Sequence, residues 1–336
     1  MDYIICEEPG HFRLKQKEKP PRAPNQALIK IEAVGICGTD LHAYAGNQPY
    51  FSYPRILGHE LAASVVEIDA HPSLQQGDQV VVIPYLHCGQ CTACDQGKTN
   101  CCAHLQVLGV HTDGGMQEYL SIHHDLLIPA PPLNFQQMAV VEPLAIGAHA
   151  LRRADIRKDE FMLVIGCGPI GLGLMKQGLI AGAQVIAMDL NHSRLQYASE
   201  VLGVRYTVNA ANRPLEQMLE ITDNALATAV FDATGNRQAL QTGHHYMAHG
   251  GRYVLVGLSK DHLSFSHPEI HAKETSILCS RNATREDFQQ VISLLEQNLF
   301  PTESYITHTV PYDQMIDQFE HWLDPENQVI KATIEF

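Results

Sequence analysis

Five of the nine cysteines in this 336-residue sequence fall between positions 88 and 102. A reducing compartment keeps thiols free, so this cluster indicates a metal site rather than a set of disulfides. Cys88-x-x-Cys91-x-x-Cys94, followed by seven residues and Cys102, offers the four thiolates of a closed, tetrahedral structural zinc site. Cys101 is the alternative fourth ligand, and the spacing favours Cys102. We expect the ion to hold a lobe, residues 85–105, that is too small to build its own core.

A second pattern is typical of dinucleotide binding. Gly166-Cys167-Gly168-Pro169-Ile170-Gly171 has the spacing G-x-G-x-x-G and lies between an apolar run, 161–165, and a helical stretch that reaches 181. Such a turn lets the backbone approach a pyrophosphate, and the following helix offers it free N–H groups. We therefore predict that Gly166, Gly168, Pro169, Ile170 and Gly171 contact a dinucleotide.

The residues after the next predicted strand indicate which dinucleotide is bound. Asp189 lies 18 residues beyond Gly171, where a carboxylate binds the ribose 2′-hydroxyl and repels a 2′-phosphate. This favours NAD over NADP, although Arg194 is placed where it could hold a phosphate. Thr234 and Val256 are also predicted to contact the cofactor.

The elements that must position these residues differ along the chain. Residues 1–150 carry short β-like runs separated by Gly and Pro, which predicts a mostly antiparallel β domain. Residues 151–282 alternate strands with helices, which predicts a doubly wound parallel sheet. Residues 283–336 contain two amphipathic helices and a last strand, 328–336, that we expect to return to the first domain. The predicted fold class is thus α/β with two domains.

Composition and charge narrow the possible partners and the location. With 45% apolar and 18% charged residues, the chain is neither disordered nor a collagen nor a disulfide scaffold. The formal charge of −14 repels phosphate backbones, so nucleic acid is not an expected partner. No apolar run approaches the roughly 20 residues of a membrane helix, and the N-terminus does not resemble a secretory signal. We expect a cytoplasmic protein with no membrane partner.

Together with the cysteine lobe and the dinucleotide loop, two further segments resemble the zinc-dependent medium-chain dehydrogenase/reductase superfamily over essentially the whole chain. These are Cys37-Gly38-Thr39-Asp40-x-His42 and Gly58-His59-Glu60. Glu142, where alcohol dehydrogenases typically carry Cys, resembles the sorbitol (polyol) dehydrogenase branch. More narrowly, three segments look like the bacterial L-galactonate oxidoreductases and starvation-sensing dehydrogenases: Gly46–Pro49, Gly109–Gly115 and Ser280–Thr284. The resemblance implies a GroES-like catalytic domain over 1–150, a Rossmann domain over 151–282 and a returning C-terminal segment over 283–336.

The resemblance also implies roles for single residues. Cys37 and His59 would bind a catalytic zinc. Of Glu60 and Glu142, one would bind the zinc directly and the other through water, and the resemblance leaves their order open. Two further residues would relay the proton, Thr39 by receiving it from the alcohol and His42 by passing it to solvent. Arg281 would lie near the nicotinamide.

These features predict an oxidoreductase that carries one catalytic and one structural zinc and uses NAD(H). Its expected substrate is the secondary alcohol of a sugar acid or polyol similar to L-galactonate. The alternatives are a simple alcohol dehydrogenase and a non-catalytic metabolite-sensing protein with the same fold. The resemblance further implies a homodimer or homotetramer.

Overall fold

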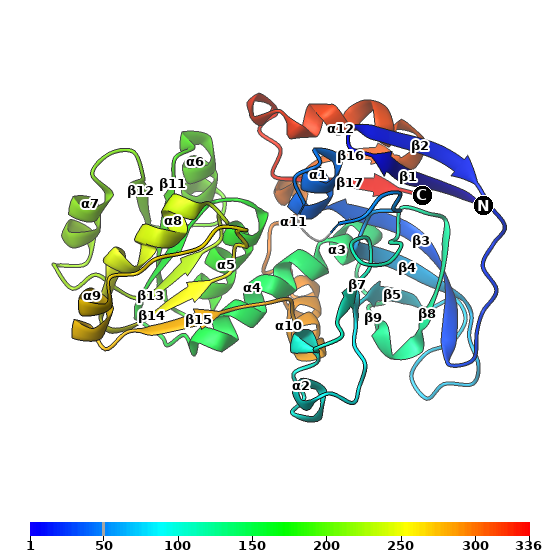
Figure 1. Ribbon diagram of the computed structural model, residues 1–336, viewed down its shortest axis with the longest axis horizontal. Coiled ribbons are helices and arrows are strands. Elements are labelled where there is room, and N and C mark those ends of the chain that lie inside the picture. The colour runs from blue at the N-terminus through cyan, green and yellow to red at the C-terminus, as the bar shows by residue number, and fades with distance from the viewer. Residues whose placement is uncertain (49–50) are drawn as a thin grey trace. The chain divides into compact units, whose positions relative to one another are not determined.

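The computed structural model describes residues 1–48 and 51–336, so Pro49 of the Gly46–Pro49 motif lies outside the described residues. The chain forms two units, which are drawn in Figure 1. Unit 1 contains Met1–Pro143 together with Thr284–Phe336, and unit 2 contains Leu144–Ala283. The division falls inside helix α4 (Val141–Ala154), whereas the sequence analysis placed it at residue 150.

The main sheet of unit 1 joins strands from both ends of the sequence. Its strands run in the order β16-β17-β3-β4-β5-β9, with β8 paired to β3. The neighbours are antiparallel except for β16 and β17, which are parallel. The C-terminal strand β17 therefore lies beside β3, as the predicted return of the last segment requires. The bounds are β3 (Gln26–Ile36), β4 (Glu60–Glu67), β5 (Gln79–Val82), β8 (Tyr119–His123), β9 (Leu127–Pro129), β16 (Ile306–Pro311) and β17 (Lys331–Glu335).

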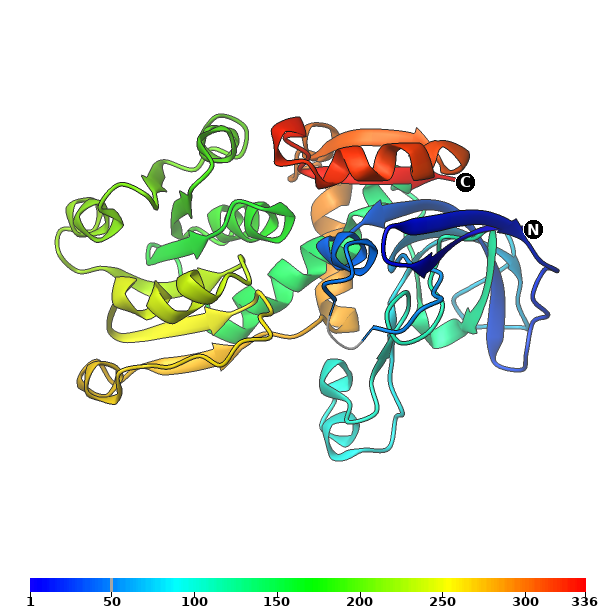
Figure 2. The ribbon, with the colours of Figure 1, turned by 45° about the horizontal axis from the view of Figure 1, so that its top comes forward.

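Two smaller strand pairs complete the β structure of unit 1. The N-terminal hairpin pairs β1 (Asp2–Glu8) with β2 (His11–Gln16), and β6 (Tyr85–Leu86) pairs with β7 (Gln106–Val107). The second pair forms the base of the cysteine lobe, which extends away from the rest of unit 1 in both views (Figures 1 and 2). An aromatic cluster of Phe12, Tyr44 and Phe319, with ring centroids 4.8–5.0 Å apart, packs the hairpin against helices from both ends of the chain.

The helices of unit 1 are short and lie mainly between strands. Their bounds are α1 (Gly38–Tyr44), α2 (Thr92–Asp95), α3 (Phe135–Ala139), α10 (Arg285–Glu296), α11 (Thr302–Tyr305) and α12 (Met315–Leu323). Single 3₁₀ turns add η1 (Thr99–Cys101), η2 (His124–Leu126), η4 (Tyr312–Gln314) and η5 (Pro325–Asn327).

Unit 2 is a parallel sheet with crossover helices, as the alternating pattern predicts. The strand order is β12-β11-β10-β13-β14-β15, and every pair is parallel. The order reverses at β10, which is where doubly wound sheets bind ligands. The strands are β10 (Phe161–Ile165), β11 (Gln184–Asp189), β12 (Tyr206–Asn209), β13 (Ala227–Asp232), β14 (Met247–Leu255) and β15 (Ser276–Cys279). The helices are α5 (Pro169–Ile180), α6 (His192–Glu200), α7 (Pro214–Ile221), α8 (Arg237–Thr242), η3 (Gly243–Tyr246) and α9 (His267–Ala272).

The sequence analysis missed some elements and misplaced the bounds of others. It did not predict the hairpin β1–β2 or strand β12, which are short and lack a long apolar run. The last strand begins at Lys331 rather than at Gln328, because Gln328 has a left-handed backbone that closes η5. In the described part of the chain, no helix is long and apolar enough to cross a membrane.

Candidate functional site

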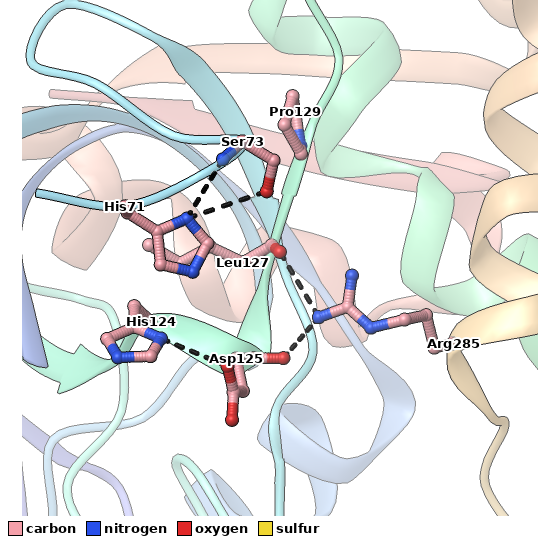
Figure 3. Close-up of a pocket in the computed structure, with 7 residues that line it drawn as sticks. All are labelled: His71, Ser73, His124, Asp125, Leu127, Pro129 and Arg285. Carbon is pink, nitrogen blue, oxygen red and sulfur yellow. Dashed lines mark hydrogen bonds and ion pairs between the residues drawn. The ribbon is translucent and has the colours of Figure 1, made fainter. Parts of the chain in front are cut away.

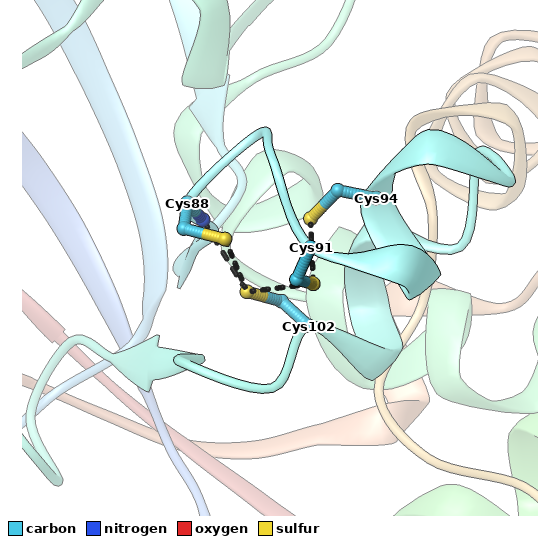
Figure 4. Close-up of side chains that lie close together, drawn as sticks. All are labelled: Cys88, Cys91, Cys94 and Cys102. Atoms are coloured by element: carbon cyan, nitrogen blue, oxygen red, sulfur yellow. Dashed lines mark hydrogen bonds between the residues drawn. The ribbon is translucent and has the colours of Figure 1, made fainter.

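The cysteine lobe gathers four thiols around one point. Cys88, Cys91, Cys94 and Cys102 point toward one another in Figure 4. The sulfur–sulfur distances are 3.5 Å for Cys91–Cys94, 3.9 Å for Cys91–Cys102 and 3.5 Å for Cys88–Cys102. Tetrahedral zinc with bonds of about 2.3 Å to sulfur separates its ligands by about 3.8 Å. These distances fit four zinc ligands and are far longer than the roughly 2.05 Å of a disulfide.

Backbone N–H groups stabilise the thiolate form of this group. Those of Cys88 and His104 lie 3.3 Å from Cys102 Sγ, and that of Ala103 lies 3.4 Å from Cys91 Sγ. Hydrogen bonds from Ala103 and Cys94 lower the pKa of the Cys91 thiol to about 6. Cys101, the alternative ligand, is exposed and lies outside the group.

A second group of ligand atoms lies in the interior of unit 1. Atoms of Cys37, His59 and Glu60 lie within 4.8 Å of one another, and His59 and Glu60 are buried. Cys37 precedes helix α1, and His59 and Glu60 enter strand β4. The carboxylate of Asp40 links these segments, because it accepts hydrogen bonds from the N–H of Cys37 (2.9 Å) and of Gly58 (3.2 Å). Asp40 thus positions both ligands that the resemblance made constant.

Close backbone packing fixes the turn that carries His59. Gly58 has φ +91°, and a side chain at Gly114 would lie 2.2 Å from the Gly58 carbonyl oxygen. Only glycine fits both conditions, since one requires a left-handed backbone and the other leaves no room for a Cβ atom. This packing explains glycines that the sequence analysis noted only as part of a resemblance.

The charges around His59 fit a bound cation. Burial lowers the pKa of His59, but the negative charges of Cys37, Asp40 and Glu142 outweigh burial and raise that pKa well above its ordinary value. Its Nδ1 atom is buried, has no hydrogen-bond partner within the described residues, and lies 3.9 Å from Asp40 Oδ1. A proton on Nδ1 facing this carboxylate leaves Nε2 as the ligand atom, an arrangement common at zinc sites. Thiolate, imidazole and carboxylate are also a donor set that catalytic zinc uses.

Glu60 is bound by a buried lysine that the sequence analysis missed. The Nζ atom of Lys331, on strand β17, lies 2.7 and 2.8 Å from the two carboxylate oxygens of Glu60 and 3.0 Å from the carbonyl oxygen of Ile36. Burial lowers the pKa of Lys331, but the charges of Glu60 and Cys37 outweigh it and raise that pKa. The lysine therefore stays protonated and offsets the charge of Glu60.

Replacing Lys331 by methionine should lower the free energy of unfolding by about 3–5 kcal/mol, because Glu60 would remain buried without a counter-charge. Lys30→Met is the matched control. Lys30 forms an ion pair of the same length, 2.7 Å, with Glu32 at the surface, and its loss should cost under about 1 kcal/mol. Urea unfolding of both variants gives the comparison. Equal losses in the two variants would contradict the importance of the buried pair.

Glu142 lies near this group with a partner of its own. It is buried in the first turn of α4, and Tyr85 Oη donates a hydrogen bond to its Oε1 atom. Burial raises the pKa of Glu142, His59 lowers it, and Glu60 raises it. Glu142 is thus close enough to interact with both residues, although the compact ligand group contains Cys37, His59 and Glu60. Both carboxylates remain candidates for the direct ligand.

The two residues of the predicted proton relay lie on helix α1. Thr39 is half-buried two positions after Cys37, and His42 is exposed one turn later. Residues three apart share one face of a helix. The helix thus leads from the half-buried Thr39 to the exposed His42.

In unit 2, the glycine loop connects β10 to α5. A Cβ atom on Gly171 would lie 1.8 Å from the Gly166 carbonyl oxygen, so glycine is required for this tight turn. Pro169 is the first residue of α5, and Gly168 is its N-cap. The loop thus has the form that dinucleotide sites use.

The other predicted cofactor residues lie at the carboxyl ends of neighbouring strands. The Asp189 carboxylate accepts hydrogen bonds from Cys167 N–H (2.6 Å) and Asn191 N–H (2.8 Å), which places it beside the glycine loop. The Arg194 guanidinium lies 3.6 Å from where a Cβ atom on Gly168 would be.

Buried Asp232 organises two further positions at this edge of the sheet. Its carboxylate accepts bonds from the N–H (2.9 Å) and hydroxyl (2.8 Å) of Thr234, and its carbonyl oxygen accepts one from Val256 N–H (3.0 Å). Arg281 is exposed, two residues beyond β15. The sequence analysis did not single out Asp232.

A cavity of about 200 Å³ in unit 1 has a different lining from these groups. Its residues, labelled in Figure 3, are His71, Ser73, His124, Asp125, Leu127, Pro129 and Arg285. It contains no thiol and shares no residue with the Cys37 group. We therefore base the function on the Cys37 group and the glycine loop.

Two family profiles match the sequence. Residues 23–132 match the alcohol dehydrogenase GroES-like domain, and residues 169–297 match the zinc-binding dehydrogenase. These ranges lie mainly in unit 1 and unit 2, respectively.

Comparison with known proteins gives relatives that match the chain from end to end. L-galactonate-5-dehydrogenase of Escherichia coli (strain K12) is 43% identical over 337 residues, covering 100% of this chain and 99% of that protein. Sorbitol dehydrogenase of Halalkalibacterium halodurans is 32% identical, covering 89% of each. Among solved structures, the alcohol dehydrogenase RspB of E. coli CFT073, in complex with NADH, superposes with a TM-score of 0.93. It is 29% identical and covers 100% of this chain and 99% of its own.

Proposed function

Because this chain belongs to the zinc-binding alcohol dehydrogenase family, we propose that it oxidises a secondary alcohol of a sugar acid or polyol with NAD, and that L-galactonate is the first substrate to test. The substrate class rests on the end-to-end similarity to L-galactonate-5-dehydrogenase and on the sorbitol dehydrogenases among the relatives. The reaction type rests on one observation, the buried group of Cys37, His59 and Glu60.

The residues of this group divide the work of binding and activation. Cys37 and His59 would hold the zinc together with Glu60 or Glu142, and a zinc ion there supplies Lewis-acid polarisation of the substrate hydroxyl. Lys331 offsets the charge of Glu60 but not that of Glu142. This difference supports Glu142 as the carboxylate that retains its full negative charge for a cation.

Proton and hydride leave the substrate by different routes. The Thr39 hydroxyl would accept the alcohol proton, and His42, exposed on the same face of α1, would pass it to solvent. NAD bound at the glycine loop accepts the hydride from the carbon that bears the hydroxyl. The products are then a ketone, NADH and one released proton.

Asp189 should determine the choice of cofactor. Asp189→Ala combined with Leu190→Arg should lower the ratio of kcat/KM for NAD to that for NADP at least about a hundredfold, or about 2.7 kcal/mol. The carboxylate that binds a ribose hydroxyl is lost, and a guanidinium replaces exposed Leu190. Leu190→Arg alone is the control and should change the ratio little. An unchanged ratio in the double variant would show that Asp189 does not read the ribose.

A substrate panel tests the proposed function. Purified enzyme with NAD is given aldonates, beginning with L-galactonate, then alditols, and then ethanol and 2-propanol, and NADH absorbance is followed. We expect kcat/KM for the best aldonate or alditol to exceed that for 2-propanol at least about a hundredfold, because polar groups in a site reject analogues that leave them unpaired.

Each alternative gives a different result in this panel. A preference for ethanol or 2-propanol would identify a simple alcohol dehydrogenase. Absence of NADH formation with every compound, although NADH binds, would identify a metabolite-sensing protein. The homodimer or homotetramer and the cytoplasmic location stay predictions, which sedimentation and cell fractionation test.

A further inference from the structure

A third group of metal-ligating side chains lies in unit 2, outside the predicted reaction site. It contains His244 and His245 of η3 and Glu269 of α9, whose ligand atoms lie within 4.8 Å of one another. His244 Nε2 lies 3.4 Å from Glu269 Oε2, and His245 Nδ1 lies 3.8 Å from the same atom. The two imidazole rings are adjacent, with centroids 4.1 Å apart.

The spacing of these atoms fits a small divalent ion. Tetrahedral zinc with bonds of about 2.0–2.1 Å to nitrogen and oxygen separates its ligands by about 3.4 Å. One measured distance equals this value, and the other exceeds it by little. Both distances are too long for strong N–H···O hydrogen bonds. The group is therefore better arranged around a common ion than for direct pairing.

Burial gives a second reason to expect a ligand. His244 is buried at 5% exposure, and its Nδ1 atom has no hydrogen-bond partner within the described residues. A buried polar ring that is poorly paired is costly, and a metal bond at Nε2 offsets part of that cost. His245 and Glu269 are partly exposed, with side chains 42% and 51% accessible, so an ion can enter from solvent.

The surrounding charges act in both directions. Burial and the neighbouring His244 lower the pKa of His245, which keeps that imidazole neutral and its lone pair available. Lys273 opposes a cation, because its ammonium lies close enough to Glu269 to interact with it. That ammonium is already held by the Met247 carbonyl oxygen at 2.7 Å. We expect Lys273 to weaken binding without preventing it.

We propose that His244, His245 and Glu269 form a third metal site, which binds a divalent ion of the zinc class and fastens α9 to η3. Its ligands are two imidazoles and one carboxylate, which leaves a position for water. These ligands come from the chain before β14 and the chain after it, so an ion would join the two segments.

The histidines of the cavity in Figure 3 are arranged less well for a metal. His71 Nδ1 accepts a hydrogen bond from Ser73 N–H at 3.3 Å, so the neutral ring carries its proton on Nε2. His124 Nδ1 is 3.0 Å from Asp125 Oδ1 and is already paired. The guanidinium of Arg285 also lines this cavity and repels a cation. These residues therefore provide a control.

Zinc binding to the zinc-loaded protein tests the proposal. Wild type and variants are dialysed against increasing Zn²⁺, and zinc per chain is measured by mass spectrometry. We expect one further equivalent in wild type, with a dissociation constant that rises at least about tenfold in Glu269→Gln and in His245→Ala. His124→Ala and His271→Ala should bind like wild type, since the His267–His271 pair on α9 lies outside the group.

Hydrogen exchange gives a second measurement that does not depend on stoichiometry. Added Zn²⁺ should protect amides of residues 267–273 in wild type but not in Glu269→Gln. Three results would overturn the proposal: no further equivalent in wild type, equal binding by Glu269→Gln and wild type, or no protection of α9.

Discussion

Cys37→Ser should remove one zinc per chain and lower kcat/KM at least about a thousandfold, or about 4 kcal/mol, with any substrate that the enzyme accepts. Cys37 lies half-buried before α1 and belongs to the compact group with His59 and Glu60. Serine has nearly the same shape, so Asp40 can still accept the backbone N–H at position 37. A serine hydroxyl does not ionise near neutral pH, so the site loses its thiolate ligand.

The matched control is Cys279→Ser, which changes an exposed cysteine beyond this group. It should keep both the zinc content and kcat/KM of wild type. Zinc is measured by mass spectrometry, and turnover by NADH absorbance. If Cys37→Ser retains two zinc ions and turnover within a few-fold of wild type, Cys37 is not a ligand of the catalytic metal.

Cys102→Ser should remove a different zinc ion and unfold the lobe. Structural zinc contributes about 10 kcal/mol or more to the folding of small zinc domains, and the lobe has little else to hold it. Helix α2 buries none of its residues, and the base of the lobe is a pair of two-residue strands. We expect one zinc per chain to be lost and limited proteolysis to cut within residues 85–105.

Cys101→Ser is the control, because Cys101 is the next residue and is exposed outside the thiol group. It should retain both zinc ions and remain resistant to protease. The opposite outcome, with zinc lost in Cys101→Ser and kept in Cys102→Ser, would reverse the choice of the fourth ligand.

Features that depend on neighbours in sequence could be predicted without the structure. The cysteine lobe lies within one short segment, so its spacing alone indicates the ligand set. The turn at Gly166–Gly171 likewise encodes its own geometry, with Asp189 at the end of the following strand. The parallel sheet follows from alternating apolar strands and helices, since such strands need crossover connections.

Features that depend on distant pairing could not be predicted. Lys331 pairs with Glu60 across 271 positions, and a lysine in a terminal strand gives no sign that it is buried. Tyr85 reaches Glu142 from a two-residue strand at the base of the lobe. Asp40 was part of a noted motif, but its bond to Gly58 depends on how α1 meets β4. Periodicity describes one element at a time, so contacts between elements need the fold.

Anomalous diffraction at the zinc absorption edge tests the central claim most directly. Crystals of protein purified with zinc are measured just above and just below the edge. We predict one peak among the four sulfurs of the lobe and one bonded to Cys37 Sγ, a nitrogen of His59 and a carboxylate oxygen of Glu60 or Glu142. Absence of the second peak, with Cys37 and His59 turned away from each other, would contradict the proposed reaction site.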